Sequence, residues 1–163
     1  RKELPEARMT LIGRGLGDAE IGANWARQQD CATGVVFRGA LSQQDVLHAL
    51  RTEGGIFVHA TLEESFCMTV LEAMAQGLPV VVLPDSGAVP WLVGDGAAGI
   101  IAKSQSSESL SQAMLMVARD VNLRQRLAVA GYDRALSMFD LESVADRYLE
   151  EYQATIQYYA SKI

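Results

Sequence analysis

The sequence has little cysteine and no long apolar run. Only two of its 163 residues are cysteine, Cys31 and Cys67, and they stand far apart without the spacing of a metal site. We therefore expect two reduced thiols in a cytoplasmic protein, with neither a disulfide framework nor a metal centre. The longest apolar run, residues 78–84, has the length of a strand and is too short to cross a membrane. No basic, apolar signal peptide opens the sequence.

Basic residues are also scarce. Lysine and arginine number 14 against 20 aspartate and glutamate, and the formal net charge is -6. This balance argues against broad electrostatic binding to nucleic acid or to anionic lipid, although it leaves room for a local cationic pocket. A composition of 49% hydrophobic and 21% charged residues is typical of a globular protein. The length predicts a single domain over residues 1–163.

Short apolar runs alternate with helix-length amphipathic segments. The runs that we expect to form strands are residues 9–13, 35–38, 56–59, 79–83 and 99–102. They are continuously apolar, which is typical of strands covered on both faces in a parallel sheet. The pattern predicts an α/β fold, an open, doubly wound and mostly parallel sheet with helices on both faces. Ligands of such sheets bind beyond the carboxyl ends of the strands, so the loops there are the expected place for a site.

Capping residues mark where the helices begin. Ser42, with Asp45 as its capping-box partner, predicts a helix over residues 43–51. Further helices are expected after a cap at Ser107, from Asn122 and from Asp140. Both ends of the sequence look incomplete. The last helix carries more aromatic surface than one small domain needs, and we expect a missing part of the protein to cover its tyrosines, Tyr148, Tyr152, Tyr158 and Tyr159.

Two carboxylates stand eight residues apart around an expected helix start. The strand ending at His59 is followed by a turn that we expect to enter a helix near Ser65, with Glu64 at its mouth and Glu72 about two turns in. The free amides of the first turn form an anion site, and its small side chains let a ligand approach closely. This layout matches a pyrophosphate flanked by two sugars. A purely structural interpretation is also open, because the helix macrodipole alone favours glutamate at a helix start.

Residues 57–82 (FVHATLEESFCMTVLEAMAQGLPVVV) resemble the signature of the family 4 glycosyltransferases, which have the GT-B fold. Glu64 and Glu72 match its two glutamates. The residues that follow in register are Ala73, Met74, Ala75, Gly77, Pro79 and Val80. Flanking blocks at residues 10–15, 35–41, 85–102 and 139–152 agree with the family, so the resemblance covers nearly the whole sequence.

The resemblance implies the Rossmann-like, C-terminal domain that binds the donor in a retaining enzyme. Such an enzyme moves a sugar from a nucleotide-diphosphate sugar to an acceptor hydroxyl. It implies that Glu64 is the catalytic residue, contacting the hydroxyls of the transferred sugar, and that Glu72 holds the ribose. The other donor contacts that we expect are Ser65, Phe66, Cys67, Met68, Thr69, Arg14, Gly15, Arg38, Gly39, His59, Ser86 and Gly87. No metal and no cofactor besides the donor is implied.

The sequence departs from the family pattern at several places. No block with the diphosphate-binding arginine and lysine precedes Arg1, and Arg14 is the candidate to replace it. Trp91 stands where an acidic residue is usual, either in the site or in the core. The expected partner is the protein's own N-terminal acceptor domain, so this chain alone should bind donor weakly and transfer nothing. Association with the inner face of a membrane is expected only through that missing half.

Two other interpretations stay open. One is an NADP-binding Rossmann domain, in which residues 13–17 form a glycine-rich phosphate loop and Arg38, at the end of the next strand, meets the 2′-phosphate. The other is a non-catalytic interaction module. Cys67 resembles a nucleophile at a helix start. The sequence shows no histidine or aspartate partnership that would support such a role.

Overall fold

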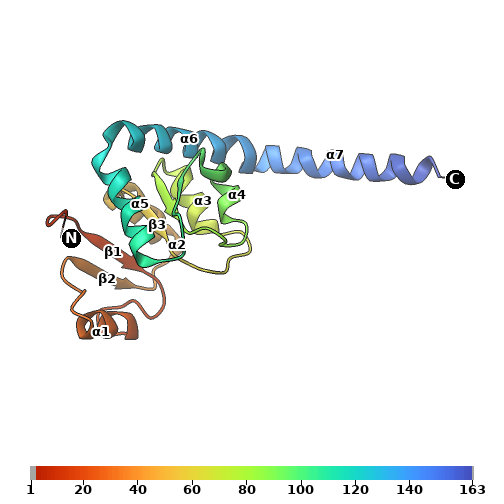
Figure 1. The fold of residues 1–163 in the computed structure, drawn as a ribbon. Helices are drawn as coiled ribbons and strands as arrows, with labels where there is room; N and C mark the ends of the chain where they lie inside the picture. The colour runs from red at the N-terminus through yellow and green to blue at the C-terminus, as the bar shows by residue number, and fades with distance from the viewer. Residues whose placement is uncertain (1–2, 163) are drawn as a thin grey trace. The chain divides into compact units, whose positions relative to one another are not determined.

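The computed structural model describes residues 3–162. The chain divides into two compact units, Arg1–Ala49 and Leu50–Ile163. Both are built from parallel strands with helices between them (Figure 1). The predicted α/β class is confirmed, with helices on both sides of the parallel strands.

The first unit holds a parallel pair of strands joined through a helix. Strand β1 (Met9–Ile12) pairs with β2 (Val35–Gly39), and α1 (Ile21–Gln28) lies between them in the sequence. Both strands lie where continuous apolar runs predict them. Helix α1 is absent from the prediction because its flanks carry no capping signal, and its N-cap residue Glu20 makes no side-chain cap. An ion pair between Arg27 and Asp18 joins the helix to the preceding loop.

The second unit contains a three-stranded parallel sheet in the order β3-β4-β5. Its strands are β3 (Phe57–His59), β4 (Val80–Val82) and β5 (Ile100–Ile101), each shorter than the apolar run that predicts it. Strand β4 is central and completely buried, as a strand covered on both faces must be. The sheet places the carboxyl ends of β3 and β4 at one edge, because parallel strands end on the same side.

Helices pack around this sheet and complete its core. They are α3 (Met68–Ala75), the short α4 (Val89–Leu92), α5 (Ser107–Arg119) and α6 (Val121–Phe139), with a 3₁₀ turn η1 (Gly94–Gly96) after α4. Helix α7 (Leu141–Ala160) follows α6, and α2 (Gln43–Glu53) crosses the boundary of the two units in the sequence. One buried cluster joins the sheet to α5 and α6. Its members are Val81, Leu83, Ala102, Ala113, Val117 and Leu127.

The predicted capping residues lie at or near the observed helix starts. The cap at Ser42 with Asp45 as its partner is confirmed: the Ser42 hydroxyl accepts from the Asp45 amide over 3.2 Å and donates to the Asp45 carboxylate over 2.6 Å. Asp140 caps α7, as predicted. Helix α5 is capped by Ser106, one residue before the predicted Ser107, and α6 by Asp120, before the predicted start at Asn122. At both α5 and α6 the observed cap is the residue with extended backbone, as N-cap geometry requires.

Helix α7 leaves most of its surface uncovered. It continues from the end of α6 away from the sheet of the second unit, and none of its residues is buried (Figure 1). Tyr148, Tyr152 and Ile156 are each more than half exposed. Within residues 3–162, no helix combines the length and the apolar character that a membrane span needs.

Candidate functional site

The segment that joins β3 to α3 is not helical before Met68. We predicted a helix from near Ser65, and this start is wrong by three residues. The reason lies at Cys67, whose φ of 73° and ψ of 75° place it in the left-handed region. Phe66 before it is drawn into a cluster of rings, with centroids 6.5 Å from Trp91 and 5.6 Å from Phe139. This packing holds the backbone away from a helical path until Cys67 has turned it.

The later start changes which groups form the positive helix end. The amides of Val70 and Leu71 already bond back to the Cys67 carbonyl. The amides of Met68 and Thr69 are therefore the ones that open the helix, and both residues are exposed. Glu72 lies only about 6 Å along the axis from Met68, one turn in, and not two turns in as predicted. Glu64 still precedes this end, separated from it by three non-helical residues.

Three side chains of different chemistry meet beside this helix start. His59 Nε2 lies 3.3 Å from Cys67 Sγ and 3.9 Å from Glu64 Oε1. Cys67 Sγ also lies 3.3 Å from the Thr69 hydroxyl. No histidine partner of Cys67 was apparent in the sequence, and the fold brings His59 to it. The only sequence signal for this contact was that His59 ends a strand at the ligand-binding edge, because eight residues of irregular chain separate the two side chains.

Burial and charge act on His59 in opposite directions. Desolvation lowers the pKa of the His59 imidazole, and the nearby Glu64 carboxylate opposes part of that shift. The side chains of His59 and Glu64 are 12% and 30% exposed, so solvent reaches the group mainly at the carboxylate. Thiol and carboxylate both face the same nitrogen of His59. A relay that activates a nucleophile needs the acid on the opposite ring nitrogen, so this is not a catalytic triad.

A glycine after β4 lies against the backbone of Glu64. A Cβ built on Gly87 would lie 1.7 Å from the Glu64 carbonyl oxygen, and Gly87 has a φ of +61°. The loop containing Ser86 and Gly87 therefore touches Glu64, as the prediction of a shared site requires. Ser86 is completely buried, and its Oγ finds no hydrogen-bond partner among residues 3–162. Its contact with a donor stays a prediction.

Trp91 belongs to the ring cluster and is partly open to solvent. Its ring packs edge-on against Phe139 with centroids 5.6 Å apart, and 46% of the residue is exposed. The Arg134 guanidinium lies 5.8 Å from the ring centroid and donates to the carbonyls of Trp91 and Leu92 over 2.8 and 2.9 Å. Trp91 thus supports the segment before α3 through Phe66.

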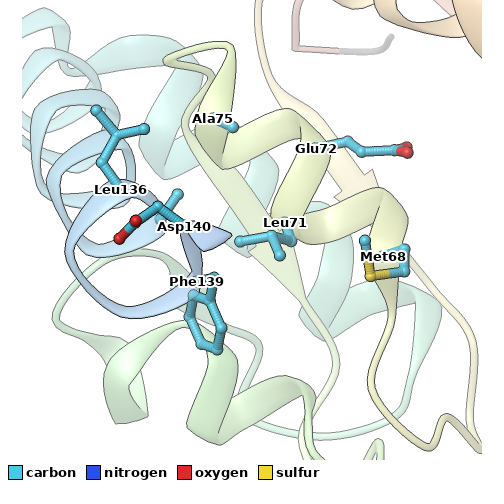
Figure 2. Close-up of a pocket in the computed structure, with 8 residues that line it drawn as sticks. Met68, Leu71, Glu72, Ala75, Leu136, Phe139 and Asp140 are labelled. Atoms are coloured by element: carbon cyan, nitrogen blue, oxygen red, sulfur yellow. The ribbon is translucent and has the colours of Figure 1, made fainter. Parts of the chain in front are cut away.

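A shallow pocket of about 230 Å³ lies along α3 at its contact with the end of α6. Met68, Leu71 and Glu72 line one side of it, and Leu136, Phe139 and Asp140 line the other (Figure 2). The lining is mostly apolar, and the Glu72 carboxylate points away from Leu136 and Asp140 (Figure 2). The pocket contains neither Glu64 nor His59. Because a phosphate needs hydrogen-bond donors, the open amides of α3 suit it better than this pocket does.

The other predicted contacts belong to the first unit. Its glycine-rich loop is tied to β2, because Gly39 donates to the Leu16 carbonyl and Gly13 donates to the Gly39 carbonyl. Gly39 has a φ of +69°, and an added Cβ would lie 3.3 Å from Gly17 Cα, so this close approach favours glycine. The side chains of Arg14 and Arg38 are exposed. Contact of Arg14, Gly15, Arg38 and Gly39 with a donor stays a prediction.

Comparison with known proteins points to one family. The family model described as "Glycosyl transferases group 1" matches residues 1–134. The GDP-mannose-dependent alpha-mannosyltransferase of Mycobacterium tuberculosis is 31% identical over 148 residues, which is 90% of this chain and 36% of that protein. The lipopolysaccharide core biosynthesis glycosyltransferase LpsE of Rhizobium meliloti is 32% identical over 95 residues, which is 58% of this chain and 28% of that protein. The chain thus spans about a third of these relatives.

Solved structures share the fold at lower identity. Anabaena HepE, solved in complex with UDP-glucose, superposes with a TM-score of 0.71 at 20% identity over 90% of this chain and 41% of that chain. The C-terminal domain of LpcC, a glycosyl transferase group 1 family protein from Francisella tularensis, gives a TM-score of 0.66 at 20% identity. That match covers 86% of this chain and 90% of the solved domain.

Proposed function

This chain belongs to the group 1 glycosyl transferases, and we propose that it is the half that binds the nucleotide-diphosphate sugar in a retaining enzyme. The observation that carries the proposal is the placement of Glu64. Its backbone is held against Gly87, and its side chain precedes the open amide end of α3. The carboxylate and the anion-binding amides are thus presented together on the second unit.

In this proposal the diphosphate binds at the start of α3. The amides of Met68 and Thr69, which are both exposed residues, donate to phosphate oxygens. The helix dipole favours the negative charge that builds up as the diphosphate leaves. The left-handed turn at Cys67 serves this role by ending the preceding segment just where the first free amides begin. Small residues on either side let the phosphate approach the backbone closely.

Glu64 orients the transferred sugar and Glu72 holds the ribose. A carboxylate accepts hydrogen bonds from sugar hydroxyls, and such a charge-assisted bond is worth about 1.5–3 kcal/mol. Positive charge develops at the sugar as the bond to the diphosphate breaks, and the new bond forms to the acceptor hydroxyl on the same face. The departing diphosphate oxygen accepts the proton that this hydroxyl loses. Neither glutamate has to transfer a proton for this reaction, because positioning and leaving-group stabilisation supply the catalysis.

We propose that the acceptor is bound by a domain outside this chain. We propose that the apolar side of α7 packs on the acceptor-binding domain, since its tyrosines have no cover in the second unit. The matched segments make up only 28% and 36% of two relatives, whose remaining length leaves room for such a domain. We propose a cytoplasmic protein, with any membrane contact made through that domain.

A dinucleotide-binding module is the second candidate. The first unit does form a strand–helix–strand arrangement with Arg38 in its second strand, as NADP recognition would need. Its five-residue glycine segment departs from the G-x-G-x-x-G spacing, and the match to the glycosyl transferase family covers this unit as well. We therefore rank it second.

Calorimetric titration separates the two candidates. UDP, GDP, ADP and NADP are titrated into the wild-type protein and into Glu72→Ala, with Glu63→Ala as the matched control because Glu63 is an exposed neighbour of the site. We expect one nucleoside diphosphate to bind and Glu72→Ala to weaken it about tenfold or more, as loss of a charge-assisted hydrogen bond predicts. Binding of NADP alone, with no response to Glu72→Ala, would exclude the glycosyl donor.

A second experiment tests the role of Glu64. In the full-length protein, Glu64→Ala is expected to reduce sugar transfer by about tenfold to a hundredfold while nucleoside diphosphate binding changes little, because Glu64 contacts the sugar and not the nucleotide. The anomeric configuration of the product, followed by NMR, is expected to equal that of the donor. Equal losses of transfer and of nucleotide binding would contradict the role given to Glu64, and an inverted product would contradict retention.

A further inference from the structure

We propose that His59, Glu64 and Cys67 form a binding site for a thiophilic divalent cation, with Zn²⁺ as the best fit. One nitrogen, one oxygen and one sulfur ligand atom, taken from these three residues, all lie within 4.8 Å of one another. Imidazole, carboxylate and thiolate are the three side-chain ligands that Zn²⁺ uses in proteins. The two-cysteine sequence offered no metal spacing, so this site is created by the fold of the β3–α3 segment.

The measured separations suit a tetrahedral ion. With Zn–N near 2.0 Å, Zn–O near 2.1 Å and Zn–S near 2.3 Å, ligand atoms of one ion lie about 3.4–3.6 Å apart. His59 Nε2 is 3.3 Å from Cys67 Sγ and 3.9 Å from Glu64 Oε1. Side-chain adjustments of about half an ångström would therefore bring these two pairs to the required distance. The third pair, Glu64 oxygen and Cys67 sulfur, lies within 4.8 Å and would have to close by up to about 1.2 Å. Three protein ligands leave the fourth position open for water or another molecule.

The thiol of Cys67 and the carboxylate of Glu64 both approach the same nitrogen of His59, which favours a metal site over a chain of hydrogen bonds. Thiol and carboxylate converge on one nitrogen of His59, which can share only one proton with them, whereas a cation at the centre would satisfy all three groups at once. Binding would displace the thiol proton of Cys67 to solvent, and the carboxylate and the thiolate together would balance the charge of the ion.

The surroundings favour a fixed ligand set. The Thr69 hydroxyl, 3.3 Å from Cys67 Sγ, can donate to the metal-bound sulfur and orient it. Cys67 is only 5% exposed, and the more open Glu64 provides the path of entry.

Zn²⁺ bound here would occupy the carboxylate that we assign to the transferred sugar. Micromolar zinc should then inhibit sugar transfer by competing with the donor. This consequence rests on the proposed function, whereas metal binding itself does not.

Cobalt titration tests the binding directly. Co²⁺ reports a thiolate ligand through a charge-transfer band in the near ultraviolet and reports tetrahedral geometry through intense visible bands. We expect the full chain to show both, with one Co²⁺ bound per chain and displacement by Zn²⁺. Cys67→Gly should abolish the charge-transfer band and still fold, because a φ of 73° suits glycine. His59→Gln and Glu64→Gln should each weaken binding at least about tenfold.

The chain supplies its own matched controls, since it has two cysteines and two histidines. Cys31→Ser changes the exposed thiol of the first unit, and His48→Gln changes the histidine of α2. Both should leave the cobalt spectrum as it is in the wild type. A wild-type chain without a thiolate band in excess Co²⁺, or a band that survives Cys67→Gly, would overturn the proposal. Because no nucleotide enters this assay, its failure and that of the donor titration are distinguishable.

Discussion

Replacing Gly87 by alanine should displace the backbone of the candidate site at Glu64. The added Cβ would lie 1.7 Å from the Glu64 carbonyl oxygen, whereas real Cβ contacts are essentially never shorter than 3.0 Å. The loop or the Glu64 backbone must therefore move by at least about 1.3 Å, the difference between these two distances. The obstacle is backbone and not the end of a flexible side chain, so no rotamer change relieves it.

The energetic cost has two parts that can be measured separately. An alanine in the left-handed region costs about 1–2 kcal/mol by itself. Gly77→Ala provides this part alone, because Gly77 has a φ of +71° and nothing lies within 4 Å of its added Cβ. The displacement at Glu64 adds to it, and we expect Gly87→Ala to lower the free energy of unfolding by about 3–4 kcal/mol in total.

Urea unfolding and two-dimensional amide NMR give the two readouts. The difference between the variants in unfolding free energy isolates the steric part, provided that the urea dependence of the two is equal. Gly87→Ala should shift the amide resonances of residues 64–69, whereas Gly77→Ala should shift those near the end of α3. If the two variants were equally stable and residues 64–69 kept their resonances in both, the contact between Gly87 and Glu64 would be refuted.

Three further perturbations test other parts of the second unit. Ser86→Ala should raise the unfolding free energy by about 1 kcal/mol, because it removes a buried hydroxyl that has no hydrogen-bond partner among residues 3–162. The control Ser109→Ala should lower the unfolding free energy by about as much, since the Ser109 hydroxyl accepts from the Ser104 amide over 3.0 Å, and a loss of stability in both variants would contradict this reasoning. In EDTA, the unfolding free energy should fall as pH decreases below about 6.5, because burial lowers the pKa of His59 and the unfolded chain therefore takes up a proton more readily than the folded one. His59→Gln should flatten this part of the plot of urea midpoint against pH. An unchanged slope in that variant would contradict the role of His59. Arg134→Lys should lower the unfolding free energy by about 1 kcal/mol in urea, because lysine lacks the forked guanidinium that donates to both the Trp91 and the Leu92 carbonyls. Arg126→Lys, on the exposed side of α6, should leave the unfolding free energy unchanged. Equal effects of the two variants would exclude a stabilising role of these two Arg134 hydrogen bonds.

The strands could be predicted because their signal is local. Val80, Val81 and Val82 form a continuous β-branched run, and a completely buried central strand requires such a run. The capping box of Ser42 and Asp45 was equally clear, because both partners lie within one helical turn. Helices α1 and α4 carried no comparable signal. Helix α4 has only four residues with a proline near its start, and α1 begins without a side-chain cap.

The position of the functional groups depends on contacts that no local pattern encodes. The family resemblance identified Glu64 and Glu72, but the start of α3 is set by Phe66 packing against Trp91 and Phe139, which lie 25 and 73 residues further along the chain. Periodicity alone extends the helix back to Ser65, because nothing in residues 65–67 forbids helical backbone. Tertiary packing overrides that preference, as it commonly does for short helices.

Cys67 shows why the error in the helix boundary and the missed contact have one origin. A residue with a side chain is held in the left-handed region at a cost of about 1–2 kcal/mol, so the surrounding contacts must favour the turn by more than this amount. The turn frees the amides of Met68 and Thr69, and it is the conformation in which Cys67 Sγ lies within 3.3 Å of His59 Nε2. A helix continued through Cys67 would engage those amides and would move the sulfur with the rotated backbone. The same strained residue therefore creates both the open helix end, where we place the diphosphate, and the convergent ligand set, where we place the metal.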